Sequence, residues 1–221
     1  MRARLFASAI TMGLLLSSGE ADATIIVPMS VEEMAAKSVS VVRARVVGAE
    51  ARWDKAKRGI HTYTTLEVLE AIHGPQRVGD RMTVRTLGGE VGEVGMRVAG
   101  TPKFASREEV VVMVRRDPMN DAHFQCIGMS QGKYRVERTA IGQVVVVPGV
   151  EGLAFASRNT SGRLSVDPDH PGPGQLTLEV FRRRVRSAFE APAPTPPDTS
   201  TPAPAKPPIT TPGTKAPDLA R

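Results

Sequence analysis

The sequence predicts an all-β fold, a small antiparallel barrel or sandwich with two flanking helices. Apolar and polar residues alternate along valine-rich segments, as at Thr64, Leu66 and Val68, and a two-residue period is typical of strands. Glycine turns, for example at Gly74 and Gly79, separate these segments at short intervals. Many short strands at regular spacing are typical of barrels and sandwiches.

The predicted strands share high valine content, alternation or both. They are expected at residues 39–53, 62–72, 82–86, 96–99, 110–115, 124–127, 133–137 and 143–147. The predicted domain therefore consists mainly of strands joined by short turns.

Helices are predicted only at the two ends of the domain. Ser30 and Glu33 have the spacing of a capping box, which starts a short helix at 31–37. A second helix is expected at 178–189 with Thr177 as its N-cap. Its apolar residues recur at helical spacing: Leu178, Phe181, Val185 and Phe189.

The start of the chain has the three parts of a secretory signal peptide. Arg2 and Arg4 form a basic region, residues 5–16 are apolar, and small residues at Ala21 and Ala23 suit a cleavage site. We expect cleavage after Ala23. The apolar run is shorter than the roughly 20 residues that cross a bilayer, so the mature protein is expected to be secreted or periplasmic without a membrane span. An uncleaved N-terminal anchor is the alternative.

Composition divides the chain into a signal peptide at 1–23, a β-barrel domain with N- and C-terminal helices at 24–190, and a tail at 191–221. The tail consists mainly of Pro, Ala, Thr and Ser, which offer little apolar surface to bury, so it is expected to be disordered. A spacer and a solubilising tail are both compatible with this composition.

The protein is moderately basic, with 29 Lys and Arg against 23 Asp and Glu. This charge favours contact with anionic envelope polymers. Nucleic acid is not expected as a partner, because only 4% of residues are aromatic and few stacking surfaces are available. Four arginines on the second predicted helix offer a polyanion site as an alternative, but we favour a solvated helix face as their explanation: Arg182, Arg183, Arg184 and Arg186.

Ser130 lies in Gly-Met-Ser-Gln-Gly, which matches the G-x-S-x-G pattern of serine hydrolases. That nucleophile elbow requires a strand before the serine, a helix after it and a largely parallel sheet. Residues 133–137 alternate like a strand instead, so we interpret residues 128–132 as a bulge or tight turn. A secreted hydrolase that uses Ser130 is kept as an alternative.

A glycine-rich segment at 88–95 lacks the Lys-Ser or Lys-Thr of a phosphate loop. We expect a flexible loop there with Glu90 and Glu93 in solvent. Because loops on rigid barrels often form binding sites, the predicted binding surface runs from this segment to Phe104. Its residues are Glu90, Glu93, Arg97, Lys103 and Phe104.

No cofactor or metal site is predicted. The histidines are far apart in the sequence: His61, His73, His123 and His170. Cys126 is the only cysteine and is expected to be buried as a small apolar side chain, so neither disulfides nor a thiolate metal site can form within one chain. Asp117, Asn120 and Asp121 offer calcium ligands as an alternative, but Pro118 favours a plain turn.

Six stretches between about residues 29 and 136 form a further pattern: Tyr63 to Glu70, His73-Gly74-Pro75, Val78-Gly79-Asp80, Gly88 to Gly92, Met96 to Phe104 and Gly128 to Val136. In these stretches the chain resembles a group of uncharacterised secreted bacterial proteins. This resemblance implies a small OB-like β-barrel, and some members are associated with matrixin-type metalloproteases. Their zinc motif is absent here, so the resemblance implies at most an accessory of an extracellular protease.

These expectations lead to an exported, non-enzymatic interaction module of the envelope or secretome. The partner is an unknown protein or an anionic envelope polymer. A structural envelope protein, held by its basic surface and its proline-rich tail, is an alternative beside the hydrolase.

Overall fold

The computed structural model describes residues 24–150, 153–158, 163–167 and 172–190. The chain divides into two units, Met1–Glu190 and Ala191–Arg221. The predicted signal peptide and the predicted disordered tail lie outside the described residues. The described part is mostly strand with two α-helices, which confirms the all-β class.

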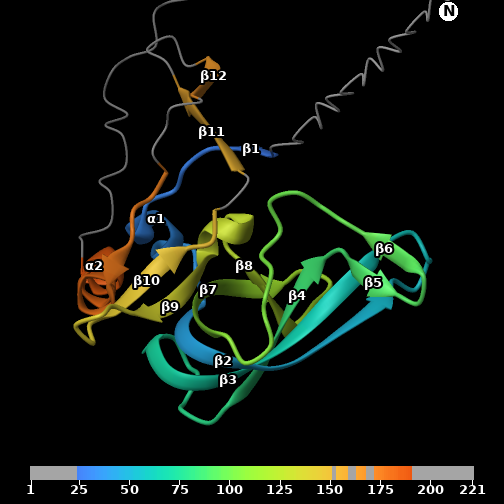
Figure 1. Cartoon of the computed structure of the whole chain (residues 1–221), viewed down its shortest axis with the longest axis horizontal. Helices are drawn as coiled ribbons and strands as arrows, with labels where there is room; N and C mark the ends of the chain where they lie inside the picture. The colour runs from blue at the N-terminus through green and yellow to red at the C-terminus, as the bar shows by residue number, and fades with distance from the viewer. Residues whose placement is uncertain (1–23, 151–152, 159–162, 168–171, 191–221) are drawn as a thin grey trace, which may run out of the picture. The chain divides into compact units, whose positions relative to one another are not determined.

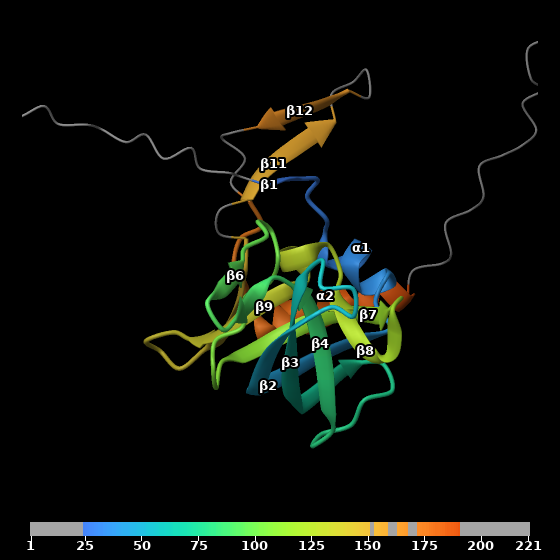
Figure 2. The ribbon, with the colours of Figure 1, turned by 90° about the vertical axis from the view of Figure 1, so that its right-hand side faces the viewer.

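The main sheet has eight strands in the order β13-β10-β9-β7-β2-β3-β4-β8 (Figure 1). Their bounds are β2 (Ser40–Trp53), β3 (Ile60–His73), β4 (Arg81–Leu87), β7 (Glu109–Asp117), β8 (Asn120–Cys126), β9 (Lys133–Arg138), β10 (Val144–Pro148) and β13 (Leu176–Thr177). Strand β8 also pairs with β7, so β7, β2, β3, β4 and β8 form a closed ring of pairings. Figure 2 shows β2, β3, β4 and β8 side by side.

The interior of this ring is apolar because strand residues alternate between its two faces. Leu66 and Val68 of β3 face the same interior as Val84 of β4 and Val112 of β7, and each is at most 1% exposed. Register shifts along the β2–β3 pair are of the kind that bends long strands. The alternation seen in the sequence therefore encodes the core directly.

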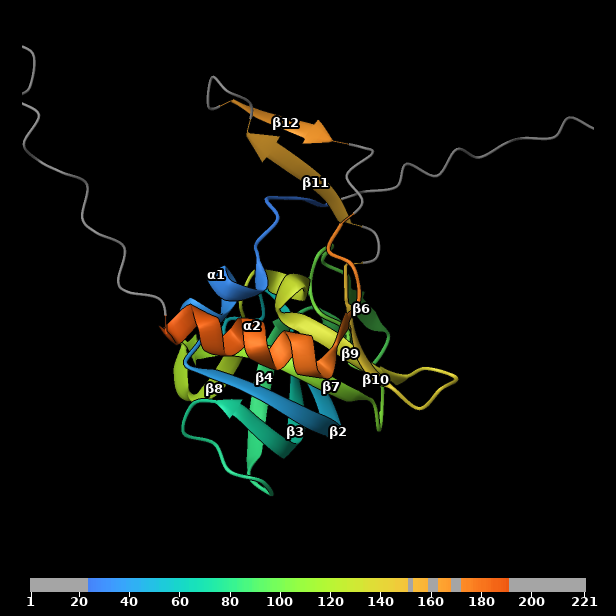
Figure 3. The same cartoon turned by 90° about the vertical axis from the view of Figure 1, so that its left-hand side faces the viewer.

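Two helices cover one side of the main sheet (Figure 3). Helix α1 (Val31–Ala36) begins with the predicted capping box of Ser30 and Glu33. Helix α2 (Leu178–Glu190) packs beside α1, and Thr177 caps it by accepting a hydrogen bond from Val180 N at 3.2 Å. Phe181 of α2 meets Tyr134 of β9 edge to face, with ring centroids 5.0 Å apart.

Two further sheets complete the described part. The parallel pair of β1 (Thr24–Ile26) with β11 (Leu153–Arg158) continues into the antiparallel β12 (Leu164–Asp167). A hairpin is formed by β5 (Gly89–Val91) and β6 (Val94–Met96). The sequence patterns predicted none of β1, β5, β11, β12 and β13.

Three predictions were wrong. Residues 88–95 form mainly the β5–β6 hairpin and not a flexible loop, while the strand expected at 96–99 ends at Met96. The pairing is not wholly antiparallel, because β4 runs parallel to β8. The tight turn expected at 128–132 is present, as one turn of 3₁₀ helix at Met129–Gly132, η1, between β8 and β9.

Candidate functional site

A cavity of about 780 Å³ lies where β3 begins and β4 ends, beside the segment 97–104. Sites for small ligands in proteins have volumes of about 300 to 1,000 Å³. Threonines of the two strands, the segment 97–104 and Ser130 of η1 line this cavity. We call it the threonine cavity.

The threonines mark the end of the apolar interior. Thr64 and Thr86 stand at inward positions of β3 and β4 and are 1% and 9% exposed. Thr86 Oγ1 donates a hydrogen bond to Thr62 O at 3.4 Å, and Thr62 Oγ1 donates to Gly88 O at 2.7 Å. The strand alternation thus continues into the cavity, but hydroxyl groups replace the aliphatic side chains.

Ser130 has a buried hydroxyl that lacks a partner. The residue is 5% exposed and lines the threonine cavity, and its backbone N donates to Gly100 O at 3.0 Å. Its Oγ atom is buried and forms no hydrogen bond with any described residue. Such a group costs free energy unless a ligand or a water molecule satisfies it.

A buried ion pair holds the segment 97–104 in place. Lys133 Nζ donates to Glu108 Oε1 at 2.7 Å and to Lys103 O at 2.6 Å. The same ammonium lies 5.3 Å from the centre of the Phe104 ring. Lys133 is only 5% exposed, so this buried ammonium group anchors the backbone carbonyl of Lys103 and contacts the ring of Phe104.

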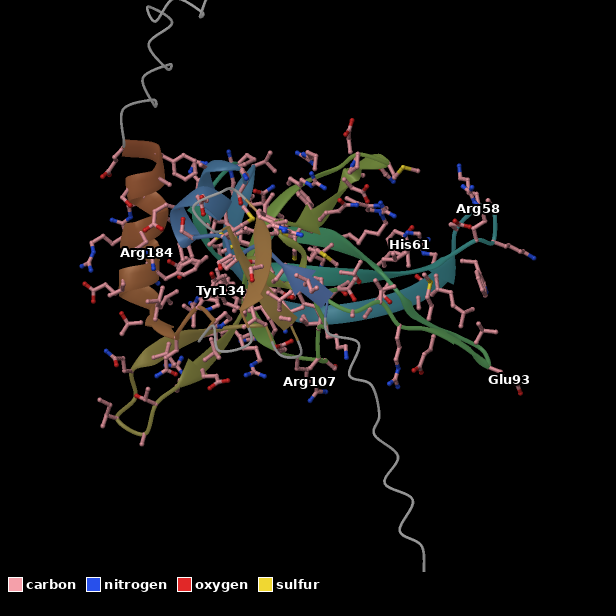
Figure 4. The ribbon with its side chains drawn as sticks, turned by 90° about the horizontal axis from the view of Figure 1, so that it is seen from above. Arg58, His61, Glu93, Arg107, Tyr134 and Arg184 are labelled. Carbon is pink, nitrogen blue, oxygen red and sulfur yellow. The ribbon has the colours of Figure 1, made fainter. Side chains whose placement is uncertain are left out.

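Four of the five residues predicted for the binding surface line this cavity: Glu90, Arg97, Lys103 and Phe104. Glu93 does not line it. Glu93 lies in the turn of the β5–β6 hairpin, and Figure 4 shows it at the end of that hairpin farthest from α2. The hairpin separates two carboxylates that are only three positions apart in the chain.

The unpaired charge of the threonine cavity is mainly positive. Arg97 and Lys103 are exposed, and their side chains form no ion pair with any described residue. Glu90 is the one carboxylate in the lining of this cavity. Two cations against one anion favour an anionic ligand.

Among the described residues, no base activates Ser130 as a nucleophile. A nucleophile needs a base within hydrogen-bond reach, and Ser130 Oγ has no partner in the part of the chain that the structure describes. The 3₁₀ turn is followed by strand β9 and not by the helix of a nucleophile elbow. His170, the only histidine after Ser130, lies outside the described residues.

The structure also shows the partners of the side chains considered above as calcium ligands and as a polyanion site. No group of three His, Cys, Asp or Glu side chains suitable for a metal occurs within the described ranges. The carboxylate of Asp117, offered above as a calcium ligand, binds the guanidinium of Arg85 instead. Two of the four arginines of α2 are also paired: Arg182 with Glu70 at 2.7 Å, and Arg184 with Glu32 at 2.6 Å.

Comparison of the chain with protein families, with curated proteins and with solved structures finds no match. In the described part of the chain, neither helix has the length and apolar character needed to cross a membrane. The functional assignment therefore depends on the site itself.

Proposed function

We propose that this protein is an exported binding module that holds an anionic ligand in the threonine cavity. The unpartnered hydroxyl of Ser130 is the observation that carries this proposal. The oxygen atom of this hydroxyl is buried, and Ser130, which is 5% exposed, lines a cavity with two unpaired cations. A ligand that accepts its hydrogen bond would remove a free-energy cost that the unliganded fold bears.

We further propose that the closed ring is an OB-like β-barrel. The OB fold is a five-stranded Greek-key barrel, and the five-membered cycle of pairings, with one parallel pair between β4 and β8, supports this assignment. In that case the segment between β4 and β7, which contains the β5–β6 hairpin and residues 97–104, forms one wall of the ligand site.

The proposed ligand is a segment of an anionic envelope polymer. Arg97 and Lys103 supply the charge complementarity, the threonine hydroxyls match sugar hydroxyls, and the Phe104 ring offers an apolar face. This chemistry fits a polysaccharide that carries carboxylates. A protein partner, such as an extracellular protease, is predicted from the sequence alone.

Export is part of the same proposal and is supported by the basic, apolar and small-residue parts of residues 1–23. An anionic envelope polymer is available only to a protein that leaves the cytoplasm. N-terminal sequencing of the protein recovered from the periplasm or the medium tests this part, and a mature start at Thr24 is expected.

Binding of a soluble uronic-acid oligosaccharide tests the site directly. The double variant Arg97→Gln, Lys103→Gln is expected to weaken binding about tenfold or more, because each hydrogen bond to a charged group contributes roughly 1.5 to 3 kcal/mol. The matched control is Arg183→Gln, Arg186→Gln, which removes the same charge from exposed positions on α2 that form no ion pair with described residues.

An equal loss of affinity in both double variants would contradict the site, because it would mean attraction by net charge alone. The oligosaccharide is also expected to keep its length after incubation with the protein. If the wild-type protein shortens the oligosaccharide and the Ser130→Ala variant does not, the result would instead support the hydrolase alternative.

A further inference from the structure

A second cavity, of about 560 Å³, lies on the other side of the segment 97–104. It shares Thr86, Leu87, Val98 and Thr101 with the threonine cavity, so this segment forms a wall of both. Most of the remaining lining comes from the residues around α1, from the end of β8 and from the start of η1, and β4 and β7 contribute Arg85 and Arg115. We call it the methionine cavity after Met29 and Met129.

The walls of the methionine cavity are mainly apolar. They include Met29, Leu87, Val98, Cys126, Ile127 and Met129. Leu87 and Met129 are 39% and 38% exposed, so large apolar side chains border the opening without being covered. Methionine adapts its shape to apolar ligands because its side chain is unbranched and polarisable.

Every charged residue in this lining is a cation: Lys37, Arg85 and Arg115. Arg85 is bound by Asp117. Arg115 Nη2 donates only to the neutral amide of Gln125, at 3.3 Å, and neither Lys37 nor Arg115 forms an ion pair with a described residue. Two exposed cations therefore stand at an apolar cavity that has no carboxylate in its lining.

The thiol of Cys126 adds no negative charge. Burial raises the pKa of this thiol to about 12, although the residue as a whole is only partly buried. The thiol is protonated at neutral pH, and it behaves as an apolar group of the wall.

We propose that the methionine cavity binds a free aliphatic carboxylate of low molecular weight. Its hydrocarbon chain lies against the methionines, and its carboxylate lies at Lys37 and Arg115. The apolar wall alone would accept any hydrocarbon. Because all the charged residues of the lining are cations, the site selects an anionic head group by charge complementarity. This site uses other cations than the threonine cavity, so the two proposals succeed or fail separately.

Titration of the full-length protein with sodium decanoate tests this proposal, with decyltrimethylammonium as a cation of equal chain length. Decanoate is expected to bind saturably at one site. Each added methylene that becomes buried strengthens binding by up to about fourfold, so Kd is expected to fall from octanoate to decanoate. Equal affinity for the ammonium compound would overturn the proposal.

The single cysteine locates the bound ligand. Because Cys126 lines the methionine cavity, decanoate is expected to slow its reaction with an uncharged disulfide reagent. The double variant Lys37→Gln, Arg115→Gln is expected to lose at least tenfold in decanoate affinity, while Arg183→Gln, Arg186→Gln keeps the wild-type value. Binding that leaves the reaction of Cys126 unchanged would place the ligand elsewhere and overturn the assignment.

Vesicles of phosphatidylglycerol distinguish a free carboxylate from a membrane. The protein is expected to bind decanoate without sedimenting with vesicles. Sedimentation with vesicles in the absence of decanoate binding would identify a membrane surface as the partner and overturn the proposal. Circular dichroism of each variant confirms that the fold is retained.

Discussion

Arg85 Nη2 donates a hydrogen bond of 2.8 Å to Asp117 Oδ1, and Arg85 Nε donates to the other carboxylate oxygen. The pair joins β4 to β7 across the ring. Asp117 is fully buried, and the side chain of Arg85 is only 13% exposed. Loss of one partner leaves the other charge buried and unpaired, so Asp117→Asn is expected to lower the free energy of unfolding by about 3 kcal/mol in urea titrations at neutral pH.

This pair also makes stability depend on pH. Burial acts to raise the pKa of Asp117, but hydrogen bonds from Arg85 and Met119 N and the charge of Arg85 outweigh it, so the pKa lies below its ordinary value of 3.8. A carboxyl group with a lowered pKa in the folded state stabilises that state above its unfolded pKa, and the contribution is lost as the pH falls through the folded pKa. The stability difference between wild type and Asp117→Asn is therefore expected to shrink below pH 3.8.

Glu50→Gln is the control for both measurements. Its carboxylate lies 3.8 Å from Arg52, and both side chains are more than half exposed, at 71% and 54%. Exposed pairs contribute little because water and salt screen them. A loss in Glu50→Gln as large as that in Asp117→Asn would contradict the role assigned to burial.

Ser130→Ala is expected to stabilise the free protein and to weaken ligand binding. Removing a buried hydroxyl that has no partner relieves a desolvation cost of about 1 kcal/mol. The same hydroxyl would hydrogen-bond to the ligand, so affinity for the uronic-acid oligosaccharide should fall. Thermal unfolding and calorimetry on one preparation measure both effects, and a destabilised Ser130→Ala protein would mean that the hydroxyl already has a partner.

Gly132→Ala is expected to be strongly destabilising. A Cβ atom at this position would collide with the carbonyl oxygen of Ile127 and lie 3.0 Å from the carbonyl oxygen of Met113. Backbone atoms cannot move aside without shifting η1 from β7, and crowding of this kind costs about 1 to 3 kcal/mol. Gly48→Ala is the matched control, because no atom lies within 4 Å of its added Cβ; chemical unfolding of the two variants measures the difference.

Lys133→Gln is expected to loosen the wall between the two cavities. It leaves Glu108, whose side chain is only 13% exposed, without its partner, and a cost of about 3 kcal/mol is expected. Hydrogen exchange at the amide of Ser130, which donates to Gly100 O, should become faster.

The double variant Lys133→Met, Glu108→Leu separates charge pairing from packing. Replacing both partners of a buried pair by apolar side chains is often neutral or better. Stability should therefore recover relative to Lys133→Gln. No recovery would show that the hydrogen bond from Lys133 to Lys103 O is the dominant contact.

Local signals predicted the fold well where the physics is local. The capping box of Ser30 and Glu33 and the cap at Thr177 involve residues at most three positions apart, and the structure confirms both. The alternation through Leu66 and Val68 also gave the buried face of β3 correctly.

Contacts between distant residues were not predictable from the same patterns. Neither the parallel pairing of β4 with β8 nor the bond from Arg85 to Asp117, 32 positions apart, leaves a local signal. The β5–β6 hairpin was missed because glycines at Gly89 and Gly95 weaken its strand pattern.

The candidate site was predicted in part. The general tendency of loops to form binding sites led to Arg97, Lys103 and Phe104. The sequence gives no indication that the hydroxyl of Ser130 lacks a partner, because hydrogen bonding depends on the folded neighbours. The one local signal for the cavity is the presence of threonines at inward positions of β3 and β4, where the alternation would otherwise place aliphatic side chains.

The second pairing of β8 has a consequence for behaviour at high concentration. An open sheet ends in strands whose unpaired N–H and C=O groups can recruit a strand from another molecule. Each of the five strands in the ring already has a neighbour on both sides. Valine-rich segments that would be prone to intermolecular association as free peptides are therefore protected by the folded protein, and this protection fails when the pairing of β8 with β7 or with β4 opens.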